Sequence, residues 1–282
     1  MNNFVKCLIA GGIIIAIGIV VLIIGLSLNG WSTNPEFTEN NWTQEDGEID
    51  SLRIELDAGH IETEYYDGDK IEVEYYTADF YKVSVRQSGN RLTIETDLKW
   101  WFGWFGINNK IPQITVRLPA GAVYDMSVHM SAGIVKLAGG TFSELETNIS
   151  AGTLSFKDSV ECANATFKLS AGTLNAGKII TNSFGLNMSA GSTDFNEIVC
   201  SSFDLRLSAG SASVNKITCP QMKVKLSAGS AHLNVEGKKN EYNINVNKSA
   251  GSCNVQNQTG TDSSKSLDVH LSAGSVNVSF SN

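Results

Sequence analysis

The sequence predicts an all-β fold, a parallel β-solenoid (β-helix) of about 19-residue Ser-Ala-Gly coils, preceded by an N-terminal transmembrane helix and an irregular β cap. Three observations lead to this prediction. The tripeptide Ser-Ala-Gly recurs at near-constant spacing, apolar and polar residues alternate on both sides of each copy, and one long uncharged segment lies near the N-terminus. Together they divide the chain into a membrane segment, a stalk, a cap and a repeat region.

The composition excludes one class of partner. The chain has 282 residues, of which 42% are hydrophobic, so it can bury a core of its own. It carries 21 Lys and Arg against 29 Asp and Glu, a formal charge of −8. Nucleic-acid binding needs a clustered basic surface, which this balance does not supply. We therefore expect no nucleic-acid partner.

The first element is an apolar segment between Leu8 and Leu28, which contains no charged residue. At about 1.5 Å per residue a helix of this length reaches about 30 Å, the thickness of a hydrocarbon core. Lys6 precedes the segment, and no Lys or Arg follows it until Arg53, so the N-terminus is expected in the cytoplasm and the rest outside. Residues 1–28 are thus predicted to be a cytoplasmic N-terminus and membrane anchor. A cleaved signal peptide is the alternative, because residues 25–27 resemble a cleavage site.

The second element, residues 29–48, is polar, contains Pro35 and has neither helical nor strand periodicity. We interpret it as a stalk.

The third element, residues 49–125, is predicted to be a degenerate first coil followed by a β cap with an aromatic insert. Residues 52–65 alternate in the same way as the later repeats, with Asp57-Ala58-Gly59 in place of Ser-Ala-Gly. Further alternating runs follow at 70–76, 81–86, 91–95 and 113–118, and residues 88–90 read as a hairpin turn. Such a region would cover the open N-terminal end of the solenoid.

The fourth element, residues 126–282, holds eight copies of Ser-Ala-Gly, which begin at Ser131, Ser150, Ser170, Ser189, Ser208, Ser227, Ser249 and Ser272. Residues one, three and five positions before each serine are mostly apolar, and the alternation resumes after the glycine. Each copy therefore predicts two strands with one buried face, hinged at a corner. One copy cannot bury its apolar row alone, so we expect the copies to stack in parallel, in chain order, with an uncapped end at Phe280.

The corner tripeptide is assigned a structural role. Glycine allows a positive φ, alanine is expected to pack inside the corner, and serine is expected to hydrogen-bond across stacked corners. The predicted corner glycines are Gly133, Gly152, Gly172, Gly191, Gly210, Gly229, Gly251 and Gly274.

Two stretches carry a family resemblance. They are Ile114-Thr115-Val116-Arg117-Leu118-Pro119-Ala120-Gly121 and Val128-His129-Met130-Ser131-Ala132-Gly133, followed by the serial corners. From about Ile49 to its end, the chain resembles the bacterial "putative adhesin" family of envelope β-solenoid proteins, a domain of unknown function that includes the membrane-anchored LiaG-like proteins. The resemblance implies an envelope location and, by the family's name, adhesion. It implies no catalytic residues.

An aromatic cluster is the sharpest candidate for a binding role. Trp100, Trp101, Phe102, Trp104 and Phe105 lie between two predicted strands. Exposed apolar patches usually mark contact sites, so these rings are candidates to contact a glycan, the bilayer interface or a protein. The alternative is a plug that folds over the end of the solenoid core.

Other polar residues give weaker hypotheses. Asp194, Glu197 and Asp204 could serve a carbohydrate-active enzyme, but neighbouring copies do not repeat them, and a solvated face explains them better. A second set of alternating carboxylates could bind a hard cation weakly, although a solvated face is again preferred; it comprises Glu55, Glu62, Glu64, Glu72 and Glu74. We expect no cofactor and no metal site.

The histidines and cysteines form no recognisable ligand set. His60, His129, His232 and His270 are dispersed and lack zinc-site spacing. Cys200 and Cys219 hold equivalent places in consecutive copies, within disulfide range, yet we expect them to stay free thiols in a ladder. No partner is evident for the two other cysteines of the repeat region, Cys162 and Cys253.

The predicted function is a non-enzymatic, membrane-anchored cell-surface scaffold or adhesin-like binding module of the bacterial envelope. The expected partners are the membrane and an envelope glycan or another envelope protein. Two alternatives stay open, an accessory partner in envelope-stress sensing and a carbohydrate-active β-helix enzyme.

Overall fold

The computed structural model describes residues 36–99 and 113–281. The chain divides into two compact units, residues 1–36 and 37–282, and the second contains the whole described fold. The apolar segment 8–28 lies outside the described residues, so the predicted anchor and the predicted domain boundaries stay predictions. Within the described ranges, no helix has the length and hydrophobicity needed to cross a membrane.

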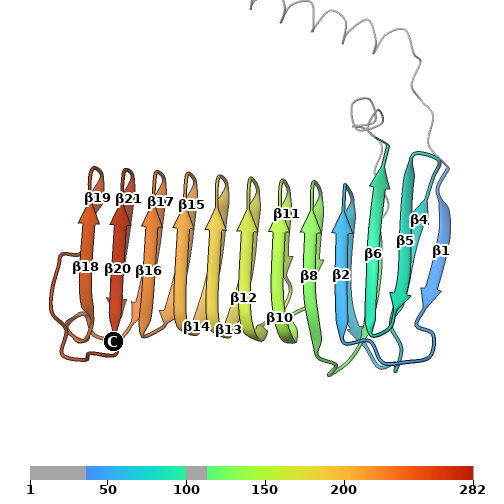
Figure 1. Cartoon of the computed structure of the whole chain (residues 1–282), viewed down its shortest axis with the longest axis horizontal. Coiled ribbons are helices and arrows are strands. Elements are labelled where there is room, and N and C mark those ends of the chain that lie inside the picture. Colours follow the sequence, from blue (N-terminus) through green and yellow to red (C-terminus); the bar gives the residue numbers. More distant parts are fainter. Residues whose placement is uncertain (1–35, 100–112, 282) are drawn as a thin grey trace, which may run out of the picture. The chain divides into compact units, whose positions relative to one another are not determined.

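The second unit is all-β, and its sheet is mostly parallel, as the alternating apolar pattern predicts (Figure 1). One short 3₁₀ helix, η1 (Lys239–Glu241), interrupts the strands. The described strands are β1 (Thr38–Thr43), β2 (Ser51–Leu56), β3 (His60–Tyr66), β4 (Glu72–Thr77), β5 (Tyr81–Ser88), β6 (Arg91–Leu98), β7 (Gln113–Pro119), β8 (Tyr124–Met130), β9 (Ile134–Leu137), β10 (Gly140–Ile149), β11 (Thr153–Phe156), β12 (Val160–Leu169), β13 (Thr173–Met188), β14 (Ser192–Leu207), β15 (Ser211–Thr218), β16 (Gln221–Leu226), β17 (Ser230–Glu236), β18 (Asn243–Lys248), β19 (Ser252–Cys253), β20 (Ser266–Leu271) and β21 (Ser275–Ser281).

The register of the sheet follows the sequence repeat. Thr173 of β13 pairs with Ser192 of β14, and Met188 pairs with Leu207, so each residue lies beside its equivalent in the next copy. The segments before the corners form one parallel row, β2, β8, β10, β12, β13, β14 and β16. The segments after the corners form a second row, β3, β9, β11, β13, β14, β15 and β17.

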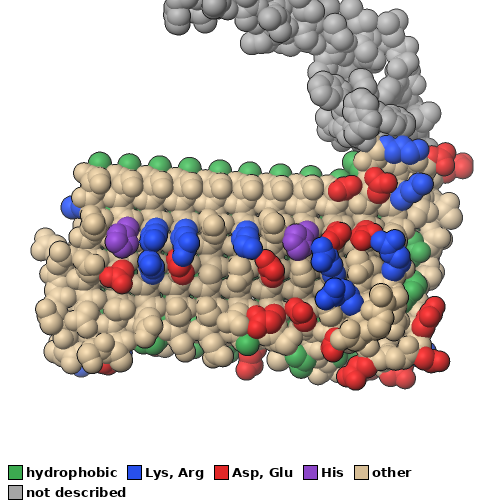
Figure 2. Space-filling view, viewed as in Figure 1, with side chains coloured by type: hydrophobic (Ala, Val, Ile, Leu, Met, Phe, Trp, Pro, Cys, Tyr) green, Lys and Arg blue, Asp and Glu red, His purple; other side chains and the backbone are tan. Residues whose placement is uncertain are grey.

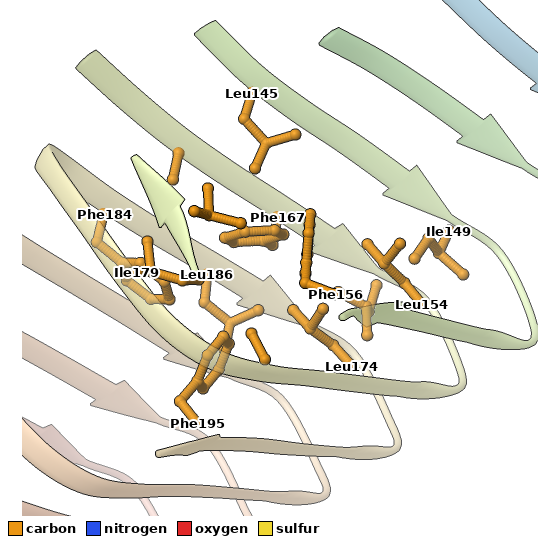
Figure 3. Close-up of a cluster of buried hydrophobic side chains, with 14 of the residues drawn as sticks. Leu145, Ile149, Leu154, Phe156, Phe167, Leu174, Ile179, Phe184, Leu186 and Phe195 are labelled. Atoms are coloured by element: carbon orange, nitrogen blue, oxygen red, sulfur yellow. The ribbon is translucent and has the colours of Figure 1, made fainter. Parts of the chain in front are cut away.

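The core lies between these rows. Side chains at alternate positions before and after each corner point inward and meet there, as the labelled residues of Figure 3 illustrate. Phe167, Phe184, Phe195 and Phe203 are buried, and the rings of Phe184 and Phe203 stack with centroids 5.1 Å apart. In-register stacking therefore places like residues against like residues along the core.

The corner glycines stack directly on one another. Gly133 has a φ of 133°, and a Cβ added to it would lie 2.0 Å from the carbonyl oxygen of Gly59. Backbone bonds tie adjacent corners together; for example, Ala151 N donates to Ser131 O at 3.0 Å and Thr153 N donates to Gly133 O at 3.0 Å. Each corner thus requires glycine for two reasons: its positive φ, and the close approach of the next coil.

Two expectations about the corners are wrong. The corner alanines, such as Ala151 and Ala209, are exposed rather than packed inside, and Figure 2 shows a row of hydrophobic side chains along the edge where the corners lie. Within the described residues, no corner serine hydroxyl makes a hydrogen bond. Backbone N–H and C=O groups of adjacent corners bond to one another, so they need no serine hydroxyl as a partner. The serine and alanine side chains therefore stay in solvent.

The last two coils stack in the reverse of their chain order. β20 pairs with β16 on one side and with β18 on the other, and β21 lies between β17 and β19. The C-terminal coil is therefore inserted, and the coil of Ser249 forms the end of the stack. The expected uncapped end at Phe280 is wrong, since Phe280 packs on the buried ring of Tyr242, with centroids 5.5 Å apart.

A returning segment of the chain also covers part of the edge of the outermost coil. Ile244 of β18 forms an antiparallel bridge with Gln258, and Val246 N donates to Asn257 Oδ1. The returning segment thus satisfies backbone groups that would otherwise be open to another chain.

The N-terminal end is closed by antiparallel strands. β6 pairs with β2 and β7 pairs with β3 in parallel, then β5 pairs with β6 and β4 with β7 in antiparallel fashion. β1 pairs with β4, so Thr38–Thr43, within the predicted stalk, form a strand although the sequence there has no strand periodicity. Apart from Trp42 these residues are polar, and they lie on the edge of the sheet, so they lack the apolar alternation from which a strand is predicted.

Two buried threonines provide a test of the core. Thr193 is 3% exposed and its hydroxyl has no hydrogen-bond partner, whereas the Thr181 hydroxyl donates to the carbonyl oxygen of Ala163 at 2.9 Å. We expect Thr193→Val to stabilise the fold by about 1 kcal/mol, because it removes an unsatisfied polar group at nearly constant volume. Thr181→Val is expected to destabilise it by about 1–2 kcal/mol. Denaturant unfolding measures both, and equal shifts in one direction would contradict this assignment.

Candidate functional surface

The predicted aromatic contact residues, Trp100, Trp101, Phe102, Trp104 and Phe105, lie outside the described residues. The strands on either side of them are described. β6 and β7 run parallel to β2 and β3, which flank the first corner at Asp57-Ala58-Gly59. The described ends of β6 and β7 therefore lie beside the two strands that meet at this corner.

The structure aligns polar side chains on the outward face of the strands that precede the corners. Two positions before each corner serine, successive coils carry in-register residues. In stacking order these are His129, Asn148, Lys168, Asn187, Arg206, Lys225, His270 and Asn247. We call this set the donor row, because every member carries an N–H donor and none is a carboxylate. The positions of these residues in the repeat are visible in the sequence, and the register shows that they are neighbours.

The donor row is open to solvent. Its asparagines, Lys168, Arg206 and Lys225 are exposed, and its two histidines are partly exposed. Adjacent strands lie about 4.8 Å apart, so the row presents a donor at each such step along the stack. Figure 2 shows lysine, arginine and histidine side chains aligned along this face.

The charges on this face are only partly neutralised. Lys168 pairs with Glu146 at 2.8 Å, which lowers the pKa of that carboxyl group. Arg206 pairs with Asp204 at 2.6 Å, and this carboxylate raises the pKa of the guanidinium. Lys225 lies in register beside Arg206 and has no ion-pair partner among the described residues. Like charges placed side by side destabilise a sheet, and Asp204 beside Arg206 offsets part of this cost.

Concave surface adjoins the donor row. A groove of about 680 Å³ lies at its N-terminal end, lined by Glu55, Asp57, Glu95 and Asp97 together with His129 of the row. A second groove of about 530 Å³ is lined in part by Arg53, Glu146 and Lys168. The face is therefore hollowed and polar along several coils.

The carboxylates considered for catalysis do not converge. Glu197 pairs with Lys178 at 3.0 Å and with Lys216 at 3.4 Å, and these two amines lower its pKa. Asp204 is bound to Arg206 and lies in the row before the corners, while Asp194 lies in the row after the corners, in register with Asn175 and Ser213. The three side chains thus belong to different parts of the coil surface.

The alternating glutamates are held mainly by cations of the protein itself. Arg117 lies 3.0 Å from Glu64, 3.6 Å from Glu72 and 3.9 Å from Glu74. Lys157 forms an ion pair with Glu62 and lowers its pKa. Glu55 pairs with Arg53. In the described ranges, no group of three or more His, Cys, Asp or Glu residues is arranged to hold a metal ion.

The histidines are likewise separate. His129 and His270 belong to the donor row, and His232 is exposed in the row after the corners. His60 has a buried Nε2 atom without a hydrogen-bond partner, and burial lowers the pKa of its ring.

Comparisons with known proteins find one family and several solved structures. A family model described as "Toastrack DUF4097" matches residues 49–281. A crystal structure described as a "putative adhesin" from Parabacteroides merdae is 11% identical, with 88% of this chain and 98% of that chain covered and a TM-score of 0.46. A second from Parabacteroides distasonis is also 11% identical, with 87% and 98% covered and a TM-score of 0.42. A third from Bacteroides fragilis is 12% identical, with 87% and 100% covered and a TM-score of 0.31. No curated protein matches the sequence.

Proposed function

The chain belongs to the Toastrack DUF4097 family, and from this premise we propose that it is a non-enzymatic, membrane-anchored scaffold or adhesin-like binding module of the bacterial cell surface. In this proposal residues 8–28 span the membrane, the N-terminus is cytoplasmic, and the stacked coils form an extracytoplasmic β-solenoid. The uncharged length of the segment and Lys6 before it support the anchor and its orientation.

The donor row is the observation that carries the binding role. A straight row of donors about 4.8 Å apart suits an extended polymer with repeated hydrogen-bond acceptors. An envelope glycan has this chemistry in its hydroxyl, ether and amide oxygens. A strongly charged polyanion suits the row less well, because the chain carries a formal charge of −8.

The test is co-sedimentation of the purified full chain with insoluble cell-wall glycan. We expect the triple variant Asn148→Ala, Asn187→Ala, Lys225→Ala to bind at least about tenfold more weakly, because three hydrogen-bonding groups are lost. The matched control is Asn175→Ala, Ser213→Ala, His232→Ala, which changes outward residues of the row after the corners. Unchanged affinity in the first variant, or an equal loss in the control, would contradict the proposal.

The aromatic cluster at 100–105 is proposed as a second contact, with a glycan, the bilayer interface or an envelope protein. The same assay includes Trp100→Ala, Trp101→Ala and Trp104→Ala in one chain. Loss of glycan binding in this variant supports a glycan contact. If only capture of an envelope protein is lost, the role as an accessory partner in envelope-stress sensing gains support instead. The carboxylates of the enzyme alternative do not converge, and no observation favours that alternative.

A further inference from the structure

We propose that Cys200 and Cys219 form an intrachain disulfide that joins two neighbouring coils when the protein meets an oxidised small-molecule or protein disulfide. In the cell this inference rests on the proposed extracytoplasmic location, where disulfides persist. It concerns a modification site and is independent of what the donor row binds.

The register brings the two thiols together. Val199 pairs with Thr218 as the last pair between β14 and β15, so Cys200 and Cys219 follow as neighbours. Strands about 4.8 Å apart place their Cα atoms within the range that a disulfide spans. Both side chains point into the protein, with 7% and 2% of the residues exposed, and both thiols are free in this structure.

A break in the ladder lets Cys219 move toward its neighbour. Side chains on in-register parallel strands are normally farther apart at Cβ than the roughly 3.8 Å of a disulfide. Here β15 ends at Thr218 and β16 begins at Gln221, and Pro220 between them has no N–H to donate to the ladder. Cys219 therefore lies outside the ladder. Its carbonyl oxygen accepts a bond from the Tyr242 hydroxyl at 3.0 Å, and its thiol donates to Gln221 O at 3.2 Å, a bond that disulfide formation gives up.

The other described cysteines do not compete. Cys162 pairs with Thr181, and Thr181 pairs with Cys200, so a threonine side chain separates Cys162 from Cys200 inside a continuous ladder. Cys253 lies on β19, in register with Val276 of the row after the corners. Only Cys200 and Cys219 are immediate neighbours among the cysteines that the structure describes.

An oxidant can reach Cys200 through a groove of about 510 Å³ that Cys162 and Cys200 line. The Cys200 thiolate attacks one sulfur of a disulfide R–S–S–R and expels one R–S⁻, giving a mixed disulfide. The Cys219 thiolate then attacks Cys200 Sγ and expels the second R–S⁻. The two R–S⁻ groups take up the two thiol protons, so the protein loses two hydrogens and the oxidant becomes two R–SH. The neighbouring Cys219 sulfur and burial raise the pKa of the Cys200 thiol, so the first attack is the slow step.

The experiment treats the purified full chain with oxidised glutathione, then alkylates free thiols in denaturant and maps the peptides by mass spectrometry. We expect a linked Cys200–Cys219 peptide that is lighter by two hydrogens and disappears on reduction. Cys200→Ser and Cys219→Ser should each abolish it, whereas Cys162→Ser and Cys253→Ser should leave it in place. Oxidation should also move the unfolding midpoint of the unsubstituted chain to higher denaturant concentration.

The proposal is overturned if both thiols remain fully alkylated after oxidation, or if Cys200 pairs with another cysteine. If a serine variant fails to fold, alanine at the same position is used, and the linked peptide should again be absent. The result does not depend on glycan binding, so failure here and failure of the proposed function are distinguishable.

Discussion

Gly191→Ala is expected to destabilise the protein by about 3–5 kcal/mol or to prevent folding. Gly191 has a φ of 118°, where L side chains are strained by about 1–3 kcal/mol. The new Cβ would also lie 2.0 Å from the carbonyl oxygen of Gly172, which is backbone and cannot turn away. Relieving this contact requires two coils to separate, and overpacking of this kind adds about 1–3 kcal/mol.

Gly177→Ala is the matched control for this prediction. Gly177 lies in β13, has no positive φ, and an added Cβ would meet no atom within 4 Å. We expect it to be neutral or to stabilise the fold by up to about 1 kcal/mol, because alanine restricts the unfolded chain. Denaturant unfolding monitored by circular dichroism compares the two variants. Equal stability of Gly191→Ala and Gly177→Ala would contradict the stacked-corner assignment.

Removing residues 238–263 is expected to make the protein associate end to end. These residues contain most of the outermost coil, which enters the chain between β17 and β20. Their excision reduces the spacing between Ser227 and Ser272 from 45 to 19 residues, the spacing of the regular copies. The C-terminal coil can then still stack on β16 and β17, but its outer edge is left open.

The exposed edge would carry the apolar rows of β20 and β21, including Leu267, Val269 and Val276, which are buried in the intact chain. Sedimentation velocity should detect a concentration-dependent shift to larger species, while circular dichroism retains the β signal. Asn245→Ala, which changes only an outward residue of β18, is the control and should leave the sedimentation profile of the intact chain unchanged. A shortened chain that folds and sediments as the intact chain does would show that the outermost coil is not a cap.

Most of the repeat fold can be predicted from the sequence because its cause is local. The apolar residues before and after each corner fix which face is buried, and the near-constant spacing fixes the register. β12 and β13, for example, end at Leu169 and Met188, directly before Ser170 and Ser189, as the alternation predicts. β13 and β14 each run unbroken from one corner to the next, where two strands are expected. Glycine at the corner follows from the same argument, since no other residue tolerates the required φ.

The order of the last coils could not be predicted from the same pattern. The strands around Ser249 and Ser272 both carry the alternation, and either could stack on the coil of Ser227. Two features of the sequence distinguish these two copies. The spacings of 22 and 23 residues leave room for a crossing connection, and Lys248 occupies a position that is apolar in the seven other copies. A lysine there is tolerated because only the outermost coil leaves that position exposed.

The candidate surface was only partly accessible to sequence reasoning. Residues that are unusual in the repeat stand out in the sequence, such as the aromatic cluster and the isolated carboxylates Asp194 and Glu197. The donor row consists of ordinary polar residues, and its significance comes from register, which aligns Asn187 with Arg206 and Lys225. Alternation indicates that these residues face outward, but only the stacking order establishes which of them are neighbours.

Cross-peaks between alanine methyl groups provide the most direct test of the stacked coils and their order. The corner alanines are exposed and adjacent corners are about 4.8 Å apart, so methyl-labelled alanine should give nuclear Overhauser effects between neighbouring coils. The structure predicts a connected series Ala190, Ala209, Ala228, Ala273 and Ala250, in that order. A cross-peak between Ala228 and Ala250, with none between Ala228 and Ala273, would contradict it.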